Sequence, residues 1–120
     1  MMESANEVCM MVAEHIDGTV EKFVERMNKQ AQDWGCKDTH FNNPHGFHDV
    51  DHYTTPYDMS LIAFNAIKDE NFSKIWGTVD HTIPANNKSP QRFLHNKDKM
   101  LKPTSDYYYQ YAIGGKTGFQ

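Results

Sequence analysis

The feature that most constrains the fold is an apolar stripe between residues 20 and 34. Apolar side chains recur there at the three- and four-residue spacing of a helix, with charged and amide side chains at the other positions: Val20, Phe23, Val24, Met27, Ala31 and Trp34. This pattern predicts a helix that buries one face against the rest of the protein. Gly35 follows at the place where a glycine commonly ends a helix. We therefore expect an amphipathic helix from about Thr19 to Trp34.

Three further segments predict helices. Ser4 with Glu7 three residues later fits a capping box, so one helix should begin at Ser4 and end at Asp17-Gly18. Thr55, Pro56 and Asp58 are typical of a cap, a first helical residue and an acidic first turn. A shorter helix is expected at about residues 71–76.

The second half of the chain predicts short extended segments. Residues 78–83 alternate with period two, residues 91–95 suggest a short strand or turn, and the aromatic run 107–113 suggests another extended segment. The predicted fold class is α+β and mainly helical, with three to four helices and a small sheet or hairpin. Because an open strand edge invites pairing, residues 107–113 also predict self-association into a dimer or larger oligomer.

Composition excludes several classes of protein. The 120 residues fit one small domain, and 38% hydrophobic with 23% charged residues is typical of a globular chain. A net charge of −4 without a basic run argues against nucleic-acid binding. No apolar run could span a bilayer and the start does not resemble a signal peptide, so we expect neither an anchor nor a leader within this sequence.

A histidine-rich segment covers residues 40–52. It contains four histidines and two aspartates, all of which are common metal ligands: His40, His45, His48, Asp49, Asp51 and His52. The segment lacks the cysteine partners or helical H-E-x-x-H pattern of strong zinc signatures. We therefore predict no metal or other cofactor. The alternative function is a non-catalytic module that binds a peptide, glycan or metal through loop 40–52.

Two triplets near the ends of the chain carry the chemistry. Ser4-Ala5-Asn6 and Lys116-Thr117-Gly118 match the S-x-N and K-T-G motifs of serine β-lactamases and penicillin-binding proteins. Alone, Ser4 could be only a helix cap and the second triplet only a turn. The two stand in the family's order, however, about 110 residues apart. The text around and between them also resembles one family, at residues 13–18, 23–28, 39–46, 51–59 and 114–119.

The chain thus resembles the low-molecular-mass D-Ala-D-Ala carboxypeptidases over essentially its whole length. The resemblance implies the helical subdomain of the penicillin-binding-protein/β-lactamase-like transpeptidase fold, with residues 1–120 forming a single partial domain. It also implies a serine peptidase of the extracytoplasmic cell envelope. That enzyme trims the terminal D-Ala from peptidoglycan stem peptides through an acyl-serine intermediate, and β-lactams acylate the same serine.

The resemblance assigns a role to each motif residue. Ser4 and Asn6 would contact the lysine of the S-x-x-K motif, with Ser4 relaying a proton to the leaving group and Asn6 binding the substrate amide. Lys116 would attract the terminal carboxylate, and the hydroxyl of Thr117 would bind it. Gly118 completes the substrate-binding motif, and the backbone N–H of Phe119 would form half of an oxyanion hole.

The S-x-x-K motif itself is not found in the sequence. No serine of the chain is followed by lysine three positions later. The nucleophilic serine and its activating lysine are therefore missing from these 120 residues. Because no other serine is paired with a base in this way, the chain alone is expected to be inactive.

Overall fold

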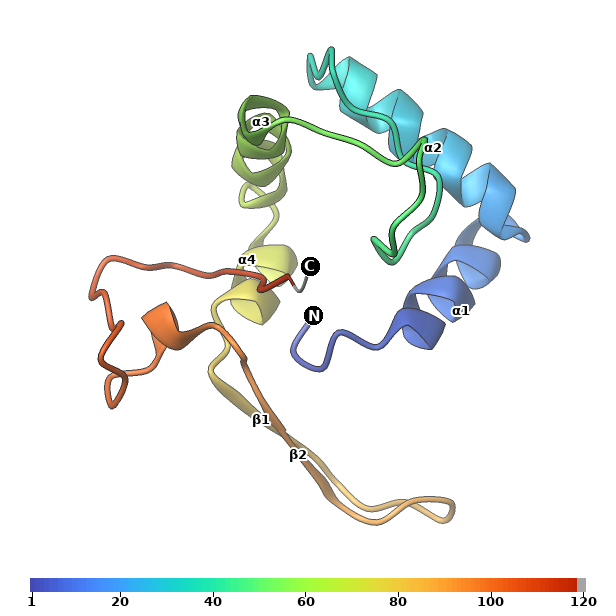
Figure 1. Cartoon of the computed structure of the whole chain (residues 1–120). Coiled ribbons are helices and arrows are strands. Elements are labelled where there is room, and N and C mark those ends of the chain that lie inside the picture. Colours follow the sequence, from blue (N-terminus) through green and yellow to red (C-terminus); the bar gives the residue numbers. More distant parts are fainter. Residues whose placement is uncertain (119–120) are drawn as a thin grey trace. The chain divides into compact units, whose positions relative to one another are not determined.

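A computed structural model describes residues 1–118 of the chain (Figure 1). The elements follow in the order α1 (Asn6–Asp17), α2 (Val20–Asp33), α3 (Pro56–Ala66), α4 (Glu70–Trp76), β1 (Asp80–Ile83), β2 (Arg92–His95) and the short 3-10 helix η1 (Lys99–Leu101). The chain divides into two compact units. One is Ala5–Ile67, and the other joins Met1–Ser4 to the residues from Lys68 onward.

Helix α2 agrees with its prediction to within one residue at each end. The hydroxyl of Thr19 caps it by accepting a hydrogen bond from the N–H of Lys22 at 3.3 Å. Gly35 follows with a φ of 87°, the left-handed conformation that favours glycine. The apolar face buries Ala31, and Ala13 of α1 is also fully buried. The stripe that predicts this helix therefore also supplies part of the small core of its unit.

The predicted start of α1 is wrong. The helix begins at Asn6 with Ala5 as its N-cap, and no side chain caps it. Ser4 has a φ of 56°, whereas an N-cap residue normally lies in the extended region. The left-handed backbone of Ser4 therefore rules out the capping box with Glu7.

The starts of α3 and α4 show how local signals set the helix boundaries. Thr55 caps α3 as predicted, since its hydroxyl accepts from the N–H of Asp58 at 3.1 Å, and Pro56 is the first helical residue. Helix α4 begins at Glu70, slightly before the predicted start. The carboxylate of Asp69 caps it by accepting from the N–H of Phe72 at 2.8 Å.

Strands β1 and β2 form an antiparallel hairpin, as predicted for residues 78–83 and 91–95. The register pairs Asp80 with His95 and Ile83 with Arg92. Residues 107–113 were also predicted to be extended and do not join the sheet, which within the described residues consists of these two strands. The run folds into turns instead, closed by hydrogen bonds from Tyr108 N–H to the Ser105 carbonyl and from Ala112 N–H to the Tyr109 carbonyl. Those turns use N–H groups that a strand ladder would need.

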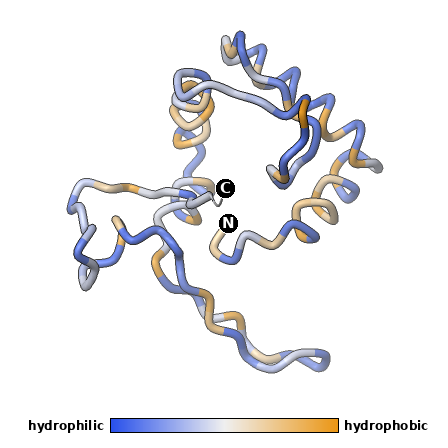
Figure 2. Tube along the Cα trace, in the orientation of Figure 1, coloured by the Kyte–Doolittle hydropathy of each residue, from blue (hydrophilic) through white to orange (hydrophobic). Residues whose placement is uncertain are grey.

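The resulting architecture is α+β and mainly helical, as expected. Many large apolar side chains stay exposed. Figure 2 shows apolar residues along α1, α3 and the strands, and further ones in the loops. Through residue 118, the helices are too short and too polar for any of them to cross a membrane.

Candidate active site

The predicted site residues are divided between the two compact units. Ser4, Lys116, Thr117 and Gly118 belong to the unit that contains α4 and the hairpin. Asn6 is the first residue of α1 and belongs to the other unit. Phe119, whose N–H was predicted to help form an oxyanion hole, lies outside the described residues.

Ser4 has an uncommon backbone conformation. Its φ of 56° lies in the left-handed region, which costs a non-glycine residue about 1–2 kcal/mol. Strained backbone of this kind clusters at active sites and switch regions, where the surrounding structure holds it in place. The interpretation of Ser4 as a helix cap does not explain why it adopts this strained backbone conformation.

Two glycines let the segment before Lys116 pack against the end of α4. A Cβ atom added to Gly114 would lie 2.7 Å from Cδ2 of the Trp76 ring. A Cβ atom added to Gly77 would lie 2.7 Å from the carbonyl oxygen of Ile113. Neither position has room for a side chain, so the backbone leading into the motif is held close to α4.

A third glycine, Gly115, meets the carboxylate of Asp98. A Cβ atom at residue 115 would lie 1.8 Å from Oδ2 of Asp98, which excludes a side chain while Asp98 keeps its position. The next residues, Lys116 and Thr117, are exposed, and the Lys116 ammonium donates to the carbonyl of Thr117. An exposed ammonium can bind an anionic group such as a carboxylate.

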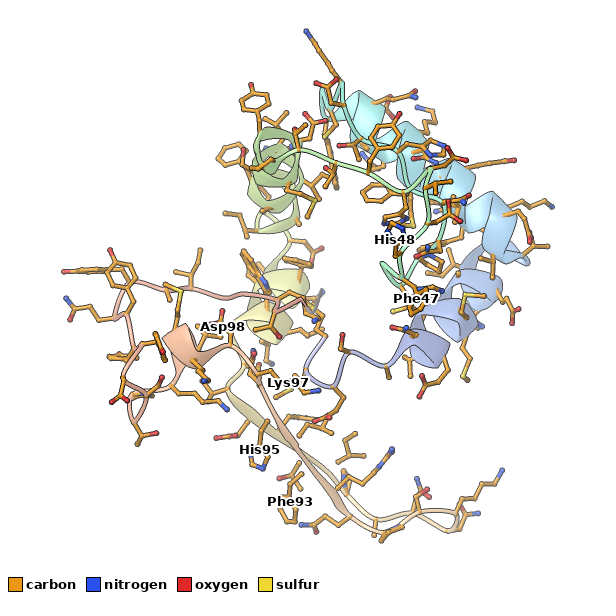
Figure 3. All side chains as sticks on the ribbon, in the orientation of Figure 1. Phe47, His48, Phe93, His95, Lys97 and Asp98 are labelled. Carbon is orange, nitrogen blue, oxygen red and sulfur yellow. The ribbon has the colours of Figure 1, made fainter. Side chains whose placement is uncertain are left out.

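Residues 96–98 were missed by the sequence analysis, although they carry the contact with Gly115. Asn96 is only 6% exposed, and its side chain donates to the carbonyl of Thr78 at 3.0 Å. Its Oδ1 accepts from the N–H of Asp98 at 2.9 Å. Figure 3 shows Lys97 and Asp98 directly after β2. The local signal was an Asn-x-Asp pattern in a turn-rich segment, which is common and does not by itself indicate a site.

Three histidines of loop 40–52, His40, His45 and His52, make hydrogen bonds within the loop. Nδ1 of His52 accepts from the N–H of Asn42 at 3.1 Å, and Nδ1 of His45 accepts from the N–H of Phe47 at 3.1 Å. Phe47 and His48 are labelled in Figure 3. Only a neutral imidazole can accept through Nδ1, so both hydrogen bonds require the neutral ring with its proton on Nε2.

The environment of His52 favours that neutral form. Burial lowers the pKa of His52, and the nearby His40 and His45 lower it further, against the opposing charge of Asp49. In the part of the chain that the structure describes, no three histidine, cysteine or acidic side chains gather as a metal ion would require.

The start of this loop is anchored by Asp58 in the first turn of α3. Asp58 is 2% exposed, and its Oδ2 accepts from the N–H of Asp38 at 2.7 Å and from the hydroxyl of Thr39 at 2.7 Å. Burial would raise its pKa, but these bonds and one from the N–H of Lys37 outweigh it and lower the pKa. Asp58 therefore stays ionised and fixes the loop to α3.

Cys36 packs beside this carboxylate. Its Sγ lies 3.6 Å from the backbone carbonyl of Asp58, and the side chain is buried. Burial and the charge of Asp58 both raise the pKa of the Cys36 thiol. A buried thiol with a raised pKa is a poor nucleophile, so Cys36 does not replace the missing serine.

An apolar groove along α2 does not coincide with the motif residues. Its volume is about 290 Å³. It is lined mainly by apolar side chains, with Arg26 and Gln30 as the polar members: Phe23, Arg26, Met27, Gln30, Ala31, Trp34, Phe41 and Ile62. None of the predicted catalytic or substrate-binding residues contributes to it.

Comparison with known proteins identifies the family. The sequence profile of the D-alanyl-D-alanine carboxypeptidase family matches residues 1–120. The carboxypeptidase DacF of Bacillus subtilis is 34% identical over 116 residues, which are 97% of this chain and 28% of DacF. The chain therefore spans less than a third of the length of that relative.

Solved structures agree on the fold. The D-alanyl-D-alanine carboxypeptidase of Mycobacterium tuberculosis superimposes with a TM-score of 0.82 and 28% identity over 98% of this chain and 42% of that one. Penicillin-binding protein 5 of Haemophilus influenzae gives a TM-score of 0.71 and 37% identity over 82% of this chain and 27% of that one. The predicted penicillin-binding-protein fold is thereby confirmed. Since the family profile covers every residue, this chain belongs to the D-alanyl-D-alanine carboxypeptidase family.

Proposed function

We propose that this chain supplies part of the active site of a serine-type D-Ala-D-Ala carboxypeptidase. The enzyme would remove the terminal D-Ala from peptidoglycan stem peptides in the cell envelope, and β-lactams would acylate its serine. The observation that carries the proposal is the family match over residues 1–120, with Ser4-Ala5-Asn6 and Lys116-Thr117-Gly118 both retained. Residues 1–120 would form one partial domain of that enzyme.

The S-x-N residues would serve the proton transfers. An acyl-serine mechanism needs a base to take the proton of the attacking hydroxyl and an acid to protonate the leaving nitrogen. The lysine of an S-x-x-K segment would be that base. Ser4 would pass the proton on to the departing D-Ala, and Asn6 would hold both the lysine and the amide of the substrate.

The K-T-G residues would bind the end of the substrate. The positive charge of Lys116 and the hydroxyl of Thr117 suit a terminal carboxylate, and both side chains are exposed to an incoming ligand. Gly118 keeps the backbone free of a side chain. The N–H of Phe119 would then donate to the developing oxyanion, an interaction worth about 3–4 kcal/mol in enzymes that use it.

By itself the chain would be inactive. It holds neither the nucleophile nor its lysine, because none of its serines begins an S-x-x-K sequence. Half of the oxyanion hole would also come from the backbone of the missing serine. Activity would require a segment that carries S-x-x-K beside these residues.

Self-association of the chain also remains a prediction. That prediction rested on an open strand edge at residues 107–113, and this run does not form a strand. Its large side chains are nevertheless between 46% and 70% exposed: Tyr107, Tyr108, Tyr109, Tyr111 and Ile113. Exposed apolar and aromatic surface favours association between copies.

Release of D-Ala from an acylated peptide ending in D-Ala-D-Ala tests the proposal. It should occur with a longer protein in which this chain follows an S-x-x-K segment, and not with the 120 residues alone. In the longer protein, Thr117→Val should lower kcat/KM, because it removes a donor to the carboxylate. Thr104→Val, at an exposed position of the same unit, is the matched control and should not. Equal rates for the two variants would contradict the role of Thr117.

A further inference from the structure

Two residues after β2, Lys97 and Asp98, contact the segments that lead into the two motifs, and Asn96 beside them holds Asp98 in place. Asn96 is the fixed point, because it is buried and makes hydrogen bonds to two backbone carbonyls. Its N–H donates to the carbonyl of Val79 at 2.7 Å, and its side-chain amide donates to the carbonyl of Thr78 at 3.0 Å. Residue 96 is thus held against the chain that joins α4 to β1.

Asp98 is fixed in turn by this asparagine. Its N–H donates to Oδ1 of Asn96 at 2.9 Å, and its own Oδ1 accepts from the N–H of Met100 at 2.9 Å as the cap of η1. One carboxylate oxygen therefore has a structural partner. The other oxygen, Oδ2, is the atom that faces Gly115.

The carboxylate of Asp98 packs tightly against Gly115. Cγ of Asp98 would lie 3.0 Å from a Cβ atom at residue 115, so the carboxylate fills the space of a side chain. On the neighbouring residue, Gly114, the Trp76 ring fills the corresponding space. The backbone immediately before Lys116 is therefore confined by an aromatic ring at one residue and a carboxylate at the next.

Lys97, between these two anchors, reaches the segment before the other motif. Its Nζ lies 3.5 Å from the carbonyl oxygen of Glu3, a long hydrogen bond, and Glu3 directly precedes the strained Ser4. Lys97 and Asp98 thus contact the segment before Ser4 and the segment before Lys116, and all of these residues lie in one compact unit.

We propose that Asp98, locked in place by Asn96, is a positioning residue that sets the backbone of Lys116-Thr117-Gly118 through its contact with Gly115. It does not touch the substrate. Its role in catalysis rests on the function proposed above, but its effect on the backbone does not. Lys97 adds a weaker contact, through the carbonyl of Glu3, with the segment that directly precedes Ser4.

Amide resonances of this 120-residue chain test the positioning directly. In two-dimensional NMR spectra, Asp98→Ala should displace or broaden the signals of residues 114–118, because the contact with Gly115 is lost. Asp98→Asn keeps the size and the capping oxygen, so it should leave these signals near their original places. Asp106→Ala, which removes an exposed carboxylate from the same unit, is the control. Unchanged signals in Asp98→Ala would overturn the proposal.

A double-mutant cycle tests the contact from its other side. Gly115→Ala should disturb the same signals, and Asp98→Ala should relieve that disturbance by making room for the methyl group, so the two effects should not add. Additive effects would overturn the proposal. If Asp98→Ala alone destabilises the chain, Asp98→Ser takes its place in the cycle, because serine is shorter than aspartate and keeps an oxygen that can cap a helix. Additive effects in that cycle would overturn the proposal as well.

The catalytic consequence is measured in the longer protein. A shift of about 1 Å at a binding group can lower a rate by about 100-fold, so acylation of Asp98→Ala by a penicillin should be between about 10- and 100-fold slower. Asp98→Asn should restore most of the rate, and Asp106→Ala should not change it. Failure of the unaltered protein to react would contradict the proposed function, whereas the NMR result would still decide the positioning.

Discussion

The hydroxyl of Thr39 donates a hydrogen bond to the buried carboxylate of Asp58 across 2.7 Å. The two residues are 19 positions apart in the sequence, and the contact joins the start of the histidine-rich loop to the first turn of α3. The N–H of Asp38 donates to the same carboxylate oxygen. Because these donors favour the ionised form, the loop is held by a charge that depends on pH.

The first prediction is that acid weakens this anchor. The pKa of Asp58 is lower in the folded chain than in the unfolded one, so ionised Asp58 stabilises the fold above the unfolded value of about 4. That contribution should be lost as the pH falls from about 4 through the folded pKa. Urea unfolding at a series of pH values measures it, and Asp58→Asn should lose less stability over this range. An equal loss in Asp58→Asn would contradict the assignment.

A second prediction compares Thr55 and Ser4, two residues that both resemble helix caps in the sequence. Thr55→Ala removes the acceptor of the Asp58 N–H, so it should lower the free energy of unfolding by about 1 kcal/mol. Ser4→Ala should change it by less than about 0.5 kcal/mol, since no side chain caps α1. Chemical denaturation of both variants makes the comparison. A similar loss for the two would show that Ser4 caps its helix after all.

Protonation of His52 provides a third prediction. Its pKa is lowered in the folded chain, so the fold favours the neutral ring and protonation destabilises it. This contribution to stability is complete above the unfolded pKa of about 6.5 and declines as the pH falls below that value toward the folded pKa. His52→Phe should remove this part of the pH dependence while keeping a ring beside Phe41. His48→Phe is the control and should retain the dependence.

The fourth prediction concerns association. Light scattering at high concentration should show a dimer or larger species, because the aromatic run 107–113 exposes large side chains. Tyr107→Ser with Tyr111→Ser should shift the distribution toward monomer, whereas Tyr57→Ser, an exposed tyrosine of the other unit, should not. A chain that is monomeric at every concentration would contradict the prediction.

Most of the fold could be predicted from local patterns, and the failures have a physical cause. The start of α3 follows from Thr55 and Pro56, and α2 follows from its apolar stripe, because caps and periodicity act within a few residues. The run 107–113 has the composition of a strand, but the hydrogen bonds of its turns decided otherwise. At Ser4 the backbone conformation overrode a good capping sequence.

The candidate site was only half predictable. Resemblance to a family supplied the two motifs, because their residue types and order are distinctive. Asn96 and Asp98 gave no comparable signal, since their importance lies in contacts with Thr78 and Gly115 that only the tertiary fold creates. Asp58 was predicted as a residue of a helix start, but its role as an anchor depends on donors 19 and 20 positions away.

The central claim is that these residues form part of a penicillin-reactive serine site without containing its nucleophile. Acylation by a fluorescent penicillin tests this most directly, with the purified chain beside the longer protein that includes an S-x-x-K segment. We predict that only the longer protein is labelled, and that Lys116→Ala in it slows labelling. Labelling of the 120 residues alone would contradict the claim that they lack the nucleophile. Failure of both proteins to react would contradict the proposed function.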